Sequence, residues 1–501
     1  MQNVLTVKQL KEVDAYTIKK LRITSLDLME IASKAFVSVF KNEVKDQSKS
    51  IAIFCGKGNN GADGLAIARL LFGDGYQNIL VYLVAVGTSF SDEYLSNLER
   101  LKATSVSIKE LGIEDDFTKA DIIIDAILGA GLNKPLSNEL KNLITEINGA
   151  QAKVFAVDVP TGLNSEGEIA NNYEGIKSDL TITFQQPKIN FFFPESGIAQ
   201  QRFEVVHIGL DKRFIAEQDT CFKIIEAVDV QSILKPRLNF SHKGTYEHAV
   251  LVAGNENTMG AAILATNACL HAGAGLSTVC LPQSGLIALN TVLPEAMALP
   301  RRANLTAEDF EKFNVLAVGP GLGINEENER LLAMLIDLRK PMVIDADGLT
   351  ILSKRKDFLL KLPNQTVLTP HVKEFDRIFG NHENWWQRLE TAKAEAKKLN
   401  VIIVLKNQFT FICLPNGDVL VNMTGNAAMA SGGMGDVLTG IITSFLAQSY
   451  SVAEAVMLGV YLHGKAGDEL AQNQFAVSAS QVAEQIPKTM KVCFDFTRNN
   501  N

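Results

Sequence analysis

Short β-branched runs alternate with longer amphipathic stretches along two separate blocks of this chain. In the first block, this alternation predicts strands that are followed by helices. The predicted strands are residues 51–54, 79–86, 121–126, 153–159 and 180–184, and the predicted helices are residues 62–72 and 136–147. Such a pattern favours a mostly parallel sheet that helices cover on both sides.

A second block with the same pattern begins near residue 225. Its predicted strands, each with a following loop, are residues 248–254, 314–323, 341–349, 365–370 and 401–407, and its predicted helices are residues 260–275, 434–448 and 451–472. Residues 211–223 are polar and are expected to form the linker. The pattern therefore predicts two α/β domains, residues 1–215 and residues 225–501.

Two amphipathic stretches precede the first block, at residues 6–20 and 25–44. They are expected to be helices that cover a face of the first sheet or form a subunit contact. For this reason we expect the chain to form homo-oligomers.

The composition indicates a folded protein with large cores, because 47% of the 501 residues are hydrophobic and 21% are charged. The formal net charge of −8 argues against a general nucleic-acid binder. The six cysteines form no C-x-x-C pair, so neither a zinc site nor a disulfide framework is expected. We find no apolar signal core, and no apolar run approaches the ~20 residues of a membrane span. These features predict a cytoplasmic protein without a membrane partner.

The stretch CGKGNNGADG follows the first predicted strand and has the spacing G-x-G-x-x-G at Gly56, Gly58 and Gly61. A glycine loop between a strand and a helix brings backbone N–H groups close to an anion, as in dinucleotide-binding domains. A dehydrogenase would also carry an acidic residue at the end of the next strand to hold the ribose. The next strand ends LVAVG without one, so the motif does not predict hydride transfer.

Asn59, Asn60 and Asp63 make this loop unusual, because three oxygen-bearing side chains could orient a polar ligand or a hard cation. The alternative is a simple turn in which Asp63 caps the following helix.

Two further strand-end loops favour a ligand, DAILGAGLNKP at residues 125–135 and AVDVPTGLNSEG at residues 156–167. The carboxyl ends of parallel strands meet at one edge of a sheet. Asp63, Asp125 and Asp158 are therefore expected to converge there.

The motifs GKGNNGADG, DAILGAG and VDVPTGL together resemble the YjeF N-terminal family, the NAD(P)H-hydrate epimerases, over roughly residues 5–212. The resemblance implies a Rossmann-like three-layer domain in which two loops bind a hydrated nicotinamide nucleotide. The implied binding residues are Asn59, Asn60, Gly61, Ala62 and Asp63, with Gly129, Ala130, Gly131, Leu132, Asn133, Lys134 and Pro135. Ala62 departs from the family, in which a second glycine is common.

The same resemblance implies a potassium ion and a catalytic carboxylate. The implied K⁺ ligands are Asn60, Asp125 and Thr161. Asp158 would lie nearest the reacting ring, where a carboxylate can act as an acid or a base.

In the second block, ASGGMGDVLTG at residues 430–440 places three glycines before a predicted helix. Free N–H groups at such a helix start would face an anion. Asp436 could be an N-cap, or it could be a general base that deprotonates a hydroxyl about to receive a phosphoryl group. A carboxylate in an anion-binding loop repels the bound anion, so this placement is unfavourable unless a reaction uses the carboxylate.

This layout resembles the ribokinase-like superfamily, and more narrowly the YjeF C-terminal family of NAD(P)H-hydrate dehydratases. The matching segments, over roughly residues 225–490, are HKGTYEHAVLVAGN, GAAILA, AVGPGLG, IDADGL, LTPHVKEF and TGNAAMASGGMGDVLTG. The resemblance implies a three-layer α/β/α domain with Mg²⁺ and with ADP as phosphoryl donor. The implied substrate contacts are Ala262, Gly323, His371 and Asp436, and the implied ADP contacts are Lys406, Asn407, Gln408, Phe409, Thr410 and Gly435.

Four positions carry alternatives or departures. His371 could instead cap a helix. Asn407 and Glu247 stand where the family commonly has glycine, and Met434 stands where it commonly has threonine. The departures concern nucleotide contacts rather than the fold.

Together the resemblances imply two activities on hydrated NADH and NADPH, namely epimerisation of the R and S forms and ADP-dependent dehydration of the S form to give AMP and phosphate. One alternative is a ribokinase-like small-molecule kinase with an accessory nucleotide-binding domain, which would use Asp436 identically. A second is a nucleotide-sensing protein with idle sites. The sequence chemistry does not distinguish ADP from ATP, or NADH from NADPH.

Overall fold

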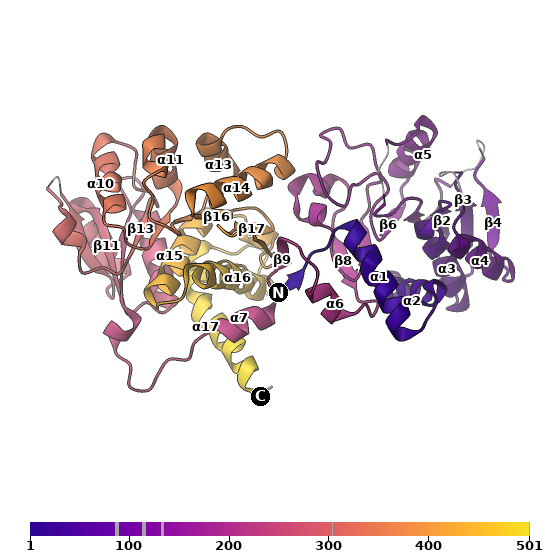
Figure 1. The fold of residues 1–501 in the computed structure, drawn as a ribbon, viewed down its shortest axis with the longest axis horizontal. Coiled ribbons are helices and arrows are strands. Elements are labelled where there is room, and N and C mark those ends of the chain that lie inside the picture. Colours follow the sequence, from indigo (N-terminus) through magenta and orange to yellow (C-terminus); the bar gives the residue numbers. More distant parts are fainter. Residues whose placement is uncertain (86–89, 113–116, 132–134, 303, 500–501) are drawn as a thin grey trace. The chain divides into compact units, whose positions relative to one another are not determined.

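The structure is a computed structural model that describes residues 1–85, 90–112, 117–131, 135–302 and 304–499. The chain divides into two compact units (Figure 1). The N-terminal unit comprises Asn3–Thr220 with Asn384–Trp386, and the C-terminal unit comprises Met1–Gln2, Cys221–Glu383 and Gln387–Asn501.

The N-terminal unit contains a seven-stranded sheet in which every neighbouring pair is parallel, in the order β4-β3-β2-β5-β6-β7-β8. Its strands are β2 (Ile51–Cys55), β3 (Ile79–Leu83), β4 (Ser107–Glu110), β5 (Ile122–Ala126), β6 (Lys153–Val157), β7 (Leu180–Phe184) and β8 (Phe203–Val206). Its helices are α1 (Val7–Leu21), α2 (Ser25–Glu43), α3 (Asn59–Gly73), α4 (Asp92–Lys102), α5 (Asn138–Gly149) and α6 (Lys212–Ala216). The winding reverses between β2 and β5, so the loops after these strands flank the position where open α/β sheets bind ligands.

Two separate hydrophobic cores cover the two faces of this sheet. Ile51, Ile53 and Cys55 belong to the core that α2 and α3 complete, whereas Ala52 and Phe54 belong to the core that α5 completes. Because successive strand residues point to opposite faces, helices are needed on both sides. The predicted three-layer α/β arrangement is confirmed, and α2 covers a face as expected.

The second sheet has eleven strands in the order β1-β9-β18-β17-β16-β15-β14-β13-β10-β11-β12. Its strands are β1 (Gln2–Asn3), β9 (Phe222–Ile224), β10 (His248–Val252), β11 (Leu276–Pro282), β12 (Met297–Arg301), β13 (Val315–Val318), β14 (Met342–Ile344), β15 (Val367–Leu368), β16 (Ile402–Leu405), β17 (Thr410–Cys413) and β18 (Val419–Asn422). The strands from β12 to β16 pair in parallel, and β17 is antiparallel to both of its neighbours. Here the winding reverses between β10 and β13.

Helices cover both faces of this second sheet. They are α7 (Ala227–Ile233), α8 (Met259–His271), α9 (Leu286–Val292), α10 (Glu326–Asp337), α11 (Ala346–Lys354), α12 (Lys356–Leu359), α13 (Val372–Phe379), α14 (Trp385–Leu399), α15 (Met434–Ala447), α16 (Val452–Ala471) and α17 (Ala479–Asn499). In the parts of the chain that the structure describes, no helix combines the length and apolar character of a bilayer crossing.

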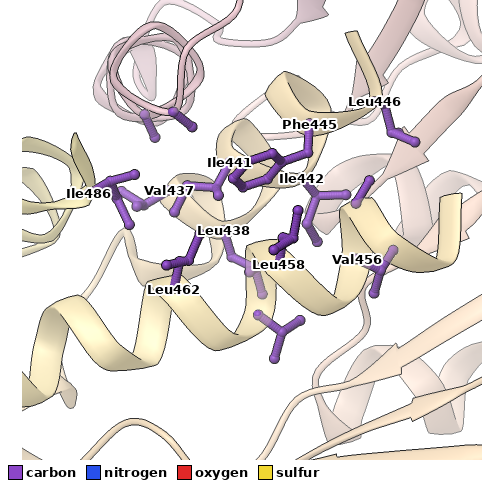
Figure 2. Packing of buried hydrophobic residues seen from close by; sticks show 14 of the residues in the cluster. Val437, Leu438, Ile441, Ile442, Phe445, Leu446, Val456, Leu458, Leu462 and Ile486 are labelled. Atoms are coloured by element: carbon purple, nitrogen blue, oxygen red, sulfur yellow. The ribbon is translucent and has the colours of Figure 1, made fainter. Parts of the chain in front are cut away.

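Helix α15 is buried on all sides after its first turn. Val437, Ile441 and Phe445 have no exposed surface, and Figure 2 shows this helix packed with Leu458 of α16 and Ile486 of α17. A helix that is apolar all round belongs in a core. Its first turn is thereby fixed at the edge of the sheet.

Candidate functional site

The first glycine loop is shaped by close backbone contacts. A Cβ atom on Gly56 would lie 2.0 Å from the carbonyl oxygen of Ile127, and one on Gly61 would lie 1.7 Å from that of Gly56. Gly56 is therefore required by the packing of this loop against the loop after β5, and Gly61 is required by its close approach to Gly56. Around Gly58 there is open space.

Helix α3 begins earlier than predicted, at Asn59, with Gly58 as its N-cap. Asp63 consequently lies inside the helix, so the alternative in which it caps the helix is wrong. The three-residue difference arises because the two asparagines, which favour turns in isolation, here form the first helical turn.

Asp125 and Thr161 join the loops after β5 and β6. The fully buried Asp125 carboxylate accepts hydrogen bonds from the Thr161 hydroxyl and the Thr161 amide, both at 2.7 Å. Burial raises the pKa of Asp125 to about 6.

Asn60 provides a further polar group near this junction. Its buried Nδ2 has no hydrogen-bond partner among the described residues, and a Cβ on Gly129 would lie 3.2 Å from its Oδ1. Carboxylate, hydroxyl and amide oxygens are the donors that hard cations prefer. Together Asn60, Asp125 and Thr161 could hold a monovalent cation beside the buried charge.

Asp158 follows β6 with a left-handed backbone, at φ 65°. Its Oδ1 accepts hydrogen bonds from the Lys188 ammonium at 2.8 Å, the Thr183 hydroxyl at 3.0 Å and the Phe184 amide at 3.1 Å. Lys188 is itself 97% buried, so the pair is largely shielded from water. Oδ2 makes no hydrogen bond within the described structure, which leaves it free to exchange a proton with a ligand.

The negative charge of Asp158 also acts on two other carboxyl groups, those of Asp14 and Asp63. Burial, and then the charge of Asp158, raise the pKa of Asp14 to about 6 and raise the pKa of Asp63 well above its usual value. The charge of Asp158 acts on Asp63, which supports that part of the predicted convergence of Asp63, Asp125 and Asp158. Sequence reasoning missed Asp14 and Lys188, which come from α1 and from the segment after β7.

The remaining residues predicted for this site lie along the two loops. Ala62 is fully buried, and Ala130 O accepts a hydrogen bond from the Ser165 hydroxyl at 3.3 Å. Gly129, Gly131 and Pro135 flank the same turn after β5. Leu132, Asn133 and Lys134 lie outside the described residues.

In the C-terminal unit, Asp436 stands in the first turn of α15, after the N-cap Gly433, whose φ is 89°. Because the N-cap is Gly433, Asp436 is the third residue of the helix, so the N-cap interpretation of Asp436 is wrong. Burial, and then the charge of Asp345, raise the pKa of Asp436 to about 6, which Lys406 partly opposes.

A buried polar junction lies beneath this glycine loop. Asp345, which follows β14 and is 98% buried, pairs with the Lys406 ammonium at 2.8 Å and accepts a hydrogen bond from the Thr439 hydroxyl at 2.9 Å. A Cβ on Gly435 would lie 3.3 Å from Lys406 Nζ. The junction thus ties β14, β16 and α15 together. Asp345 carries the same strand-end signal as Asp125, and that signal could have identified it from sequence.

His371 caps α13, as its alternative interpretation holds. Its Nδ1 accepts hydrogen bonds from the amides of Lys373 and Glu374, although half of the side chain stays exposed. Gly323 donates its amide hydrogen to Asp347 at 2.8 Å. Ala262 has no exposed surface and packs against Gly254.

Lys406 to Thr410 form the turn between the antiparallel strands β16 and β17. Within it Asn407, Phe409 and Thr410 are partly exposed and Gln408 is exposed. Met434 packs at the margin of the main core.

Glu247 has φ 55° and ψ −172°, a conformation that is essentially restricted to glycine. The glycine that the resemblance implies at this position would adopt this conformation without strain.

Within the described ranges, no group of three or more His, Cys, Asp or Glu side chains is arranged to hold a metal ion. Mg²⁺ usually binds through one or two carboxylates together with substrate phosphates. Asp436 and its acidic neighbours fit a Mg²⁺ ion that arrives with a nucleotide.

Comparison with known proteins gives matches to both units. Residues 25–190 match the family described as YjeF-related protein N-terminus, and residues 249–488 match NAD(P)H-hydrate dehydratase. The bifunctional NAD(P)H-hydrate repair enzyme Nnr of Moorella thermoacetica is 34% identical over 97% of this chain and 96% of its own length. The enzyme of the same name from Thermofilum pendens is 31% identical over 97% and 96%.

A solved structure also resembles the C-terminal unit. A ribokinase-like superfamily protein from Enterococcus faecalis V583 is 31% identical, with a TM-score of 0.52 over 55% of this chain and 98% of that chain. The predicted ribokinase-like fold is confirmed. The end-to-end matches show that this chain belongs to the family of bifunctional NAD(P)H-hydrate repair enzymes, as its sequence motifs predict.

Proposed function

We propose that this chain repairs hydrated nicotinamide coenzymes in two steps. An N-terminal domain, residues 1–215, interconverts the R and S forms of hydrated NADH and NADPH. A C-terminal domain, residues 225–501, dehydrates the S form with ADP. The observation that carries this proposal is that each unit has a carboxylate beside a glycine loop at the carboxyl edge of its sheet. These carboxylates are Asp158 and Asp436.

In the first step, Asp158 exchanges a proton with the ring hydroxyl. Protonation of that oxygen breaks the carbon–oxygen bond and releases water, while the lone pair of the ring nitrogen stabilises the cation left behind. Water then adds to the opposite face and returns its proton to the carboxylate. Lys188 and Thr183 support this role, because they hold one oxygen of Asp158 and leave the other available.

Asn60, Asp125 and Thr161 are the residues that would hold K⁺. The ion would supply compensation for the buried charge of Asp125 and would steady the loops after β2, β5 and β6. The loops then present their glycines to the phosphates of the nucleotide, through Asn59 to Asp63 and Gly129 to Pro135.

In the second step, Asp436 takes the proton from the ring hydroxyl, and the oxygen attacks the terminal phosphoryl group of ADP. The phosphorus–oxygen bond to AMP breaks, and phosphate then leaves the ring carbon. The neighbouring carbon gives up a proton, which restores the dihydronicotinamide. A raised pKa of about 6 suits Asp436 to accept a proton near neutral pH.

We assign the nucleotide contacts to Lys406, Asn407, Gln408, Phe409, Thr410 and Gly435, and the substrate contacts to Ala262, Gly323, His371 and Asp436. Mg²⁺ bound with ADP would supply charge neutralisation at the transferred phosphoryl group. Helix α15 directs its N-terminal amide groups to the same charge.

The test is incubation of the chain with hydrated NADH, ADP and Mg²⁺. Recovery of the dihydronicotinamide absorbance with release of AMP and phosphate supports repair. A phosphorylated product that persists would instead support the small-molecule kinase. Turnover that survives both Asp158→Asn and Asp436→Asn would contradict the assigned roles.

A further inference from the structure

A recess of the N-terminal unit lies beside the glycine loop that follows β5 and shares Gly131 and Pro135 with it. This cavity of about 870 Å³ is bordered by Gly131 and Pro135, by the first turns of α1, and by the segment 162–175. Its volume falls in the roughly 300–1,000 Å³ range of small-molecule sites. Asp125 and Asp158 are not among its lining residues.

The charged side chains around the cavity leave two lysines without partners. Lys8 and Lys11, three residues apart and thus on one face of α1, both line it and make no ion pair or hydrogen bond with the described residues. Lys141 is paired with Glu174 at 2.6 Å. Glu166 also lines the cavity and is an exposed residue. Among the described residues, the charged side chains that line the cavity outside the Lys141–Glu174 pair are therefore Lys8, Lys11 and Glu166, which leaves an excess of positive charge.

Apolar residues of a compact segment also form part of the cavity wall. Leu163, Ile169 and Tyr173 contribute to it. The segment is held by a hydrogen bond of 2.9 Å from the Tyr173 hydroxyl to Ile176 O. At Gly162, where φ is 101°, an added Cβ would lie 2.5 Å from Gly175, so the segment folds tightly on itself. A planar base could lie against this wall.

We infer that this cavity binds the adenosine end of the hydrated dinucleotide, with Lys8 and Lys11 at a phosphate group. The inference rests on the proposed epimerase function and extends it to the recognition of the substrate. Adenosine phosphates combine an apolar planar base with negative charge. The cavity offers apolar residues to the base and lysines to the negative charge. Ser165 ties the cavity segment to the turn at Ala130, which belongs to the loop after β5. Helix α1 precedes the residues matched to the N-terminal family, which begin at residue 25.

Photolabelling tests the location of the base independently of activity. The full chain is irradiated with an 8-azidoadenine analogue of NADP⁺ and digested with trypsin, which releases residues 154–177 as one peptide. We expect label on this peptide that unmodified NADP⁺ competes away, and about tenfold less label in the Lys8→Gln/Lys11→Gln double variant. Lys19→Gln, an exposed change on the same helix, is the matched control and should label as the wild type does. Absence of competed label on this peptide, or equal labelling of the double variant, would overturn the inference.

Kinetics then identify which phosphate the lysines contact. In the double variant we expect the KM of epimerisation to rise about tenfold with kcat unchanged. A rise confined to hydrated NADPH assigns the lysines to its additional phosphate, whereas an equal rise for both coenzymes assigns them to the pyrophosphate. An unchanged KM for both overturns the lysine contact. A wild-type chain that labels as expected but does not epimerise either coenzyme refutes the proposed function and leaves the cavity assignment standing.

Discussion

Replacement of Asp345 by asparagine probes how the junction beneath the glycine loop tunes Asp436. The change removes one negative charge, yet the amide oxygen can still accept the hydrogen bond from Thr439. The charge of Asp345 is, after burial, the largest influence that raises the pKa of Asp436 to about 6. Its removal also releases Lys406 from its ion pair, and the freed positive charge favours the Asp436 carboxylate. Both effects lower the pKa.

The size of the shift follows from Coulomb's law. Unit charges 4 Å apart interact by about 4 kcal/mol at an effective dielectric constant of 20. Asp345 contacts Thr439, one helical turn beyond Asp436, and its charge is partly neutralised by Lys406. An effect of the order of 1–2 kcal/mol remains, which corresponds to about one pKa unit because one unit is about 1.4 kcal/mol.

The assay is the pH dependence of kcat/KM for dehydration, whose acid limb reports the free enzyme. A base must be deprotonated to act, so wild-type activity should fall as the pH drops below about 6. The limb of Asp345→Asn should lie about one unit lower. Lys406→Met should move it upwards, because it removes a positive charge. This electrostatic account would be refuted if the acid limbs of the two variants shifted in the same direction. It would also be refuted if neither limb shifted while both variants remained folded.

Three further predictions concern stability and the phosphoryl donor. Because the folded pKa of Asp436 is raised, its charged form costs folding free energy at pH values above about 6, and the cost disappears as the pH falls towards the unfolded value of 3.8. In urea titrations, Asp436→Asn should therefore raise the free energy of unfolding by the order of 2 kcal/mol at pH 8 and by little at pH 4. An increase in the free energy of unfolding that does not depend on pH would contradict this prediction. Glu247→Gly should raise the free energy of unfolding by about 1 kcal/mol, because it relieves the strain of a backbone conformation that only glycine adopts easily. Glu247→Ala should not raise it. Equal melting temperatures for the two variants would argue against strain at this position. At equal concentrations ADP should support faster dehydration than ATP, and a clear preference for ATP defeats the donor assignment.

The sequence predicted the parts of this molecule whose signals are local. Strands such as β2 and β7 are short apolar runs bounded by loops, and the loops after β2, β5 and β6 reach one edge because parallel strands require it. The pattern did not predict β11, β12, β17 or β18. Two of these form a hairpin in a sheet that was expected to be mostly parallel.

Partners that come from distant elements were not predictable in the same way. Lys188 lies 30 residues beyond Asp158, and Lys406 lies 61 residues beyond Asp345. A single lysine in a polar segment gives no indication of which carboxylate it meets until the strand order is known. Asp14 was assigned only to an amphipathic helix, because helical periodicity identifies a face and not the charge that the face approaches.

The central claim is that two carboxylates act in sequence on one damaged coenzyme. The most direct measurement follows conversion of mixed R and S hydrated NADH in the presence of ADP and Mg²⁺, with each variant compared with the wild type. We predict that the wild type converts both forms, that Asp158→Asn rapidly converts the S form alone, and that Asp436→Asn converts neither but still interchanges them. An Asp158→Asn variant that consumes both forms at the wild-type rate, or an Asp436→Asn variant that restores NADH, would contradict the account.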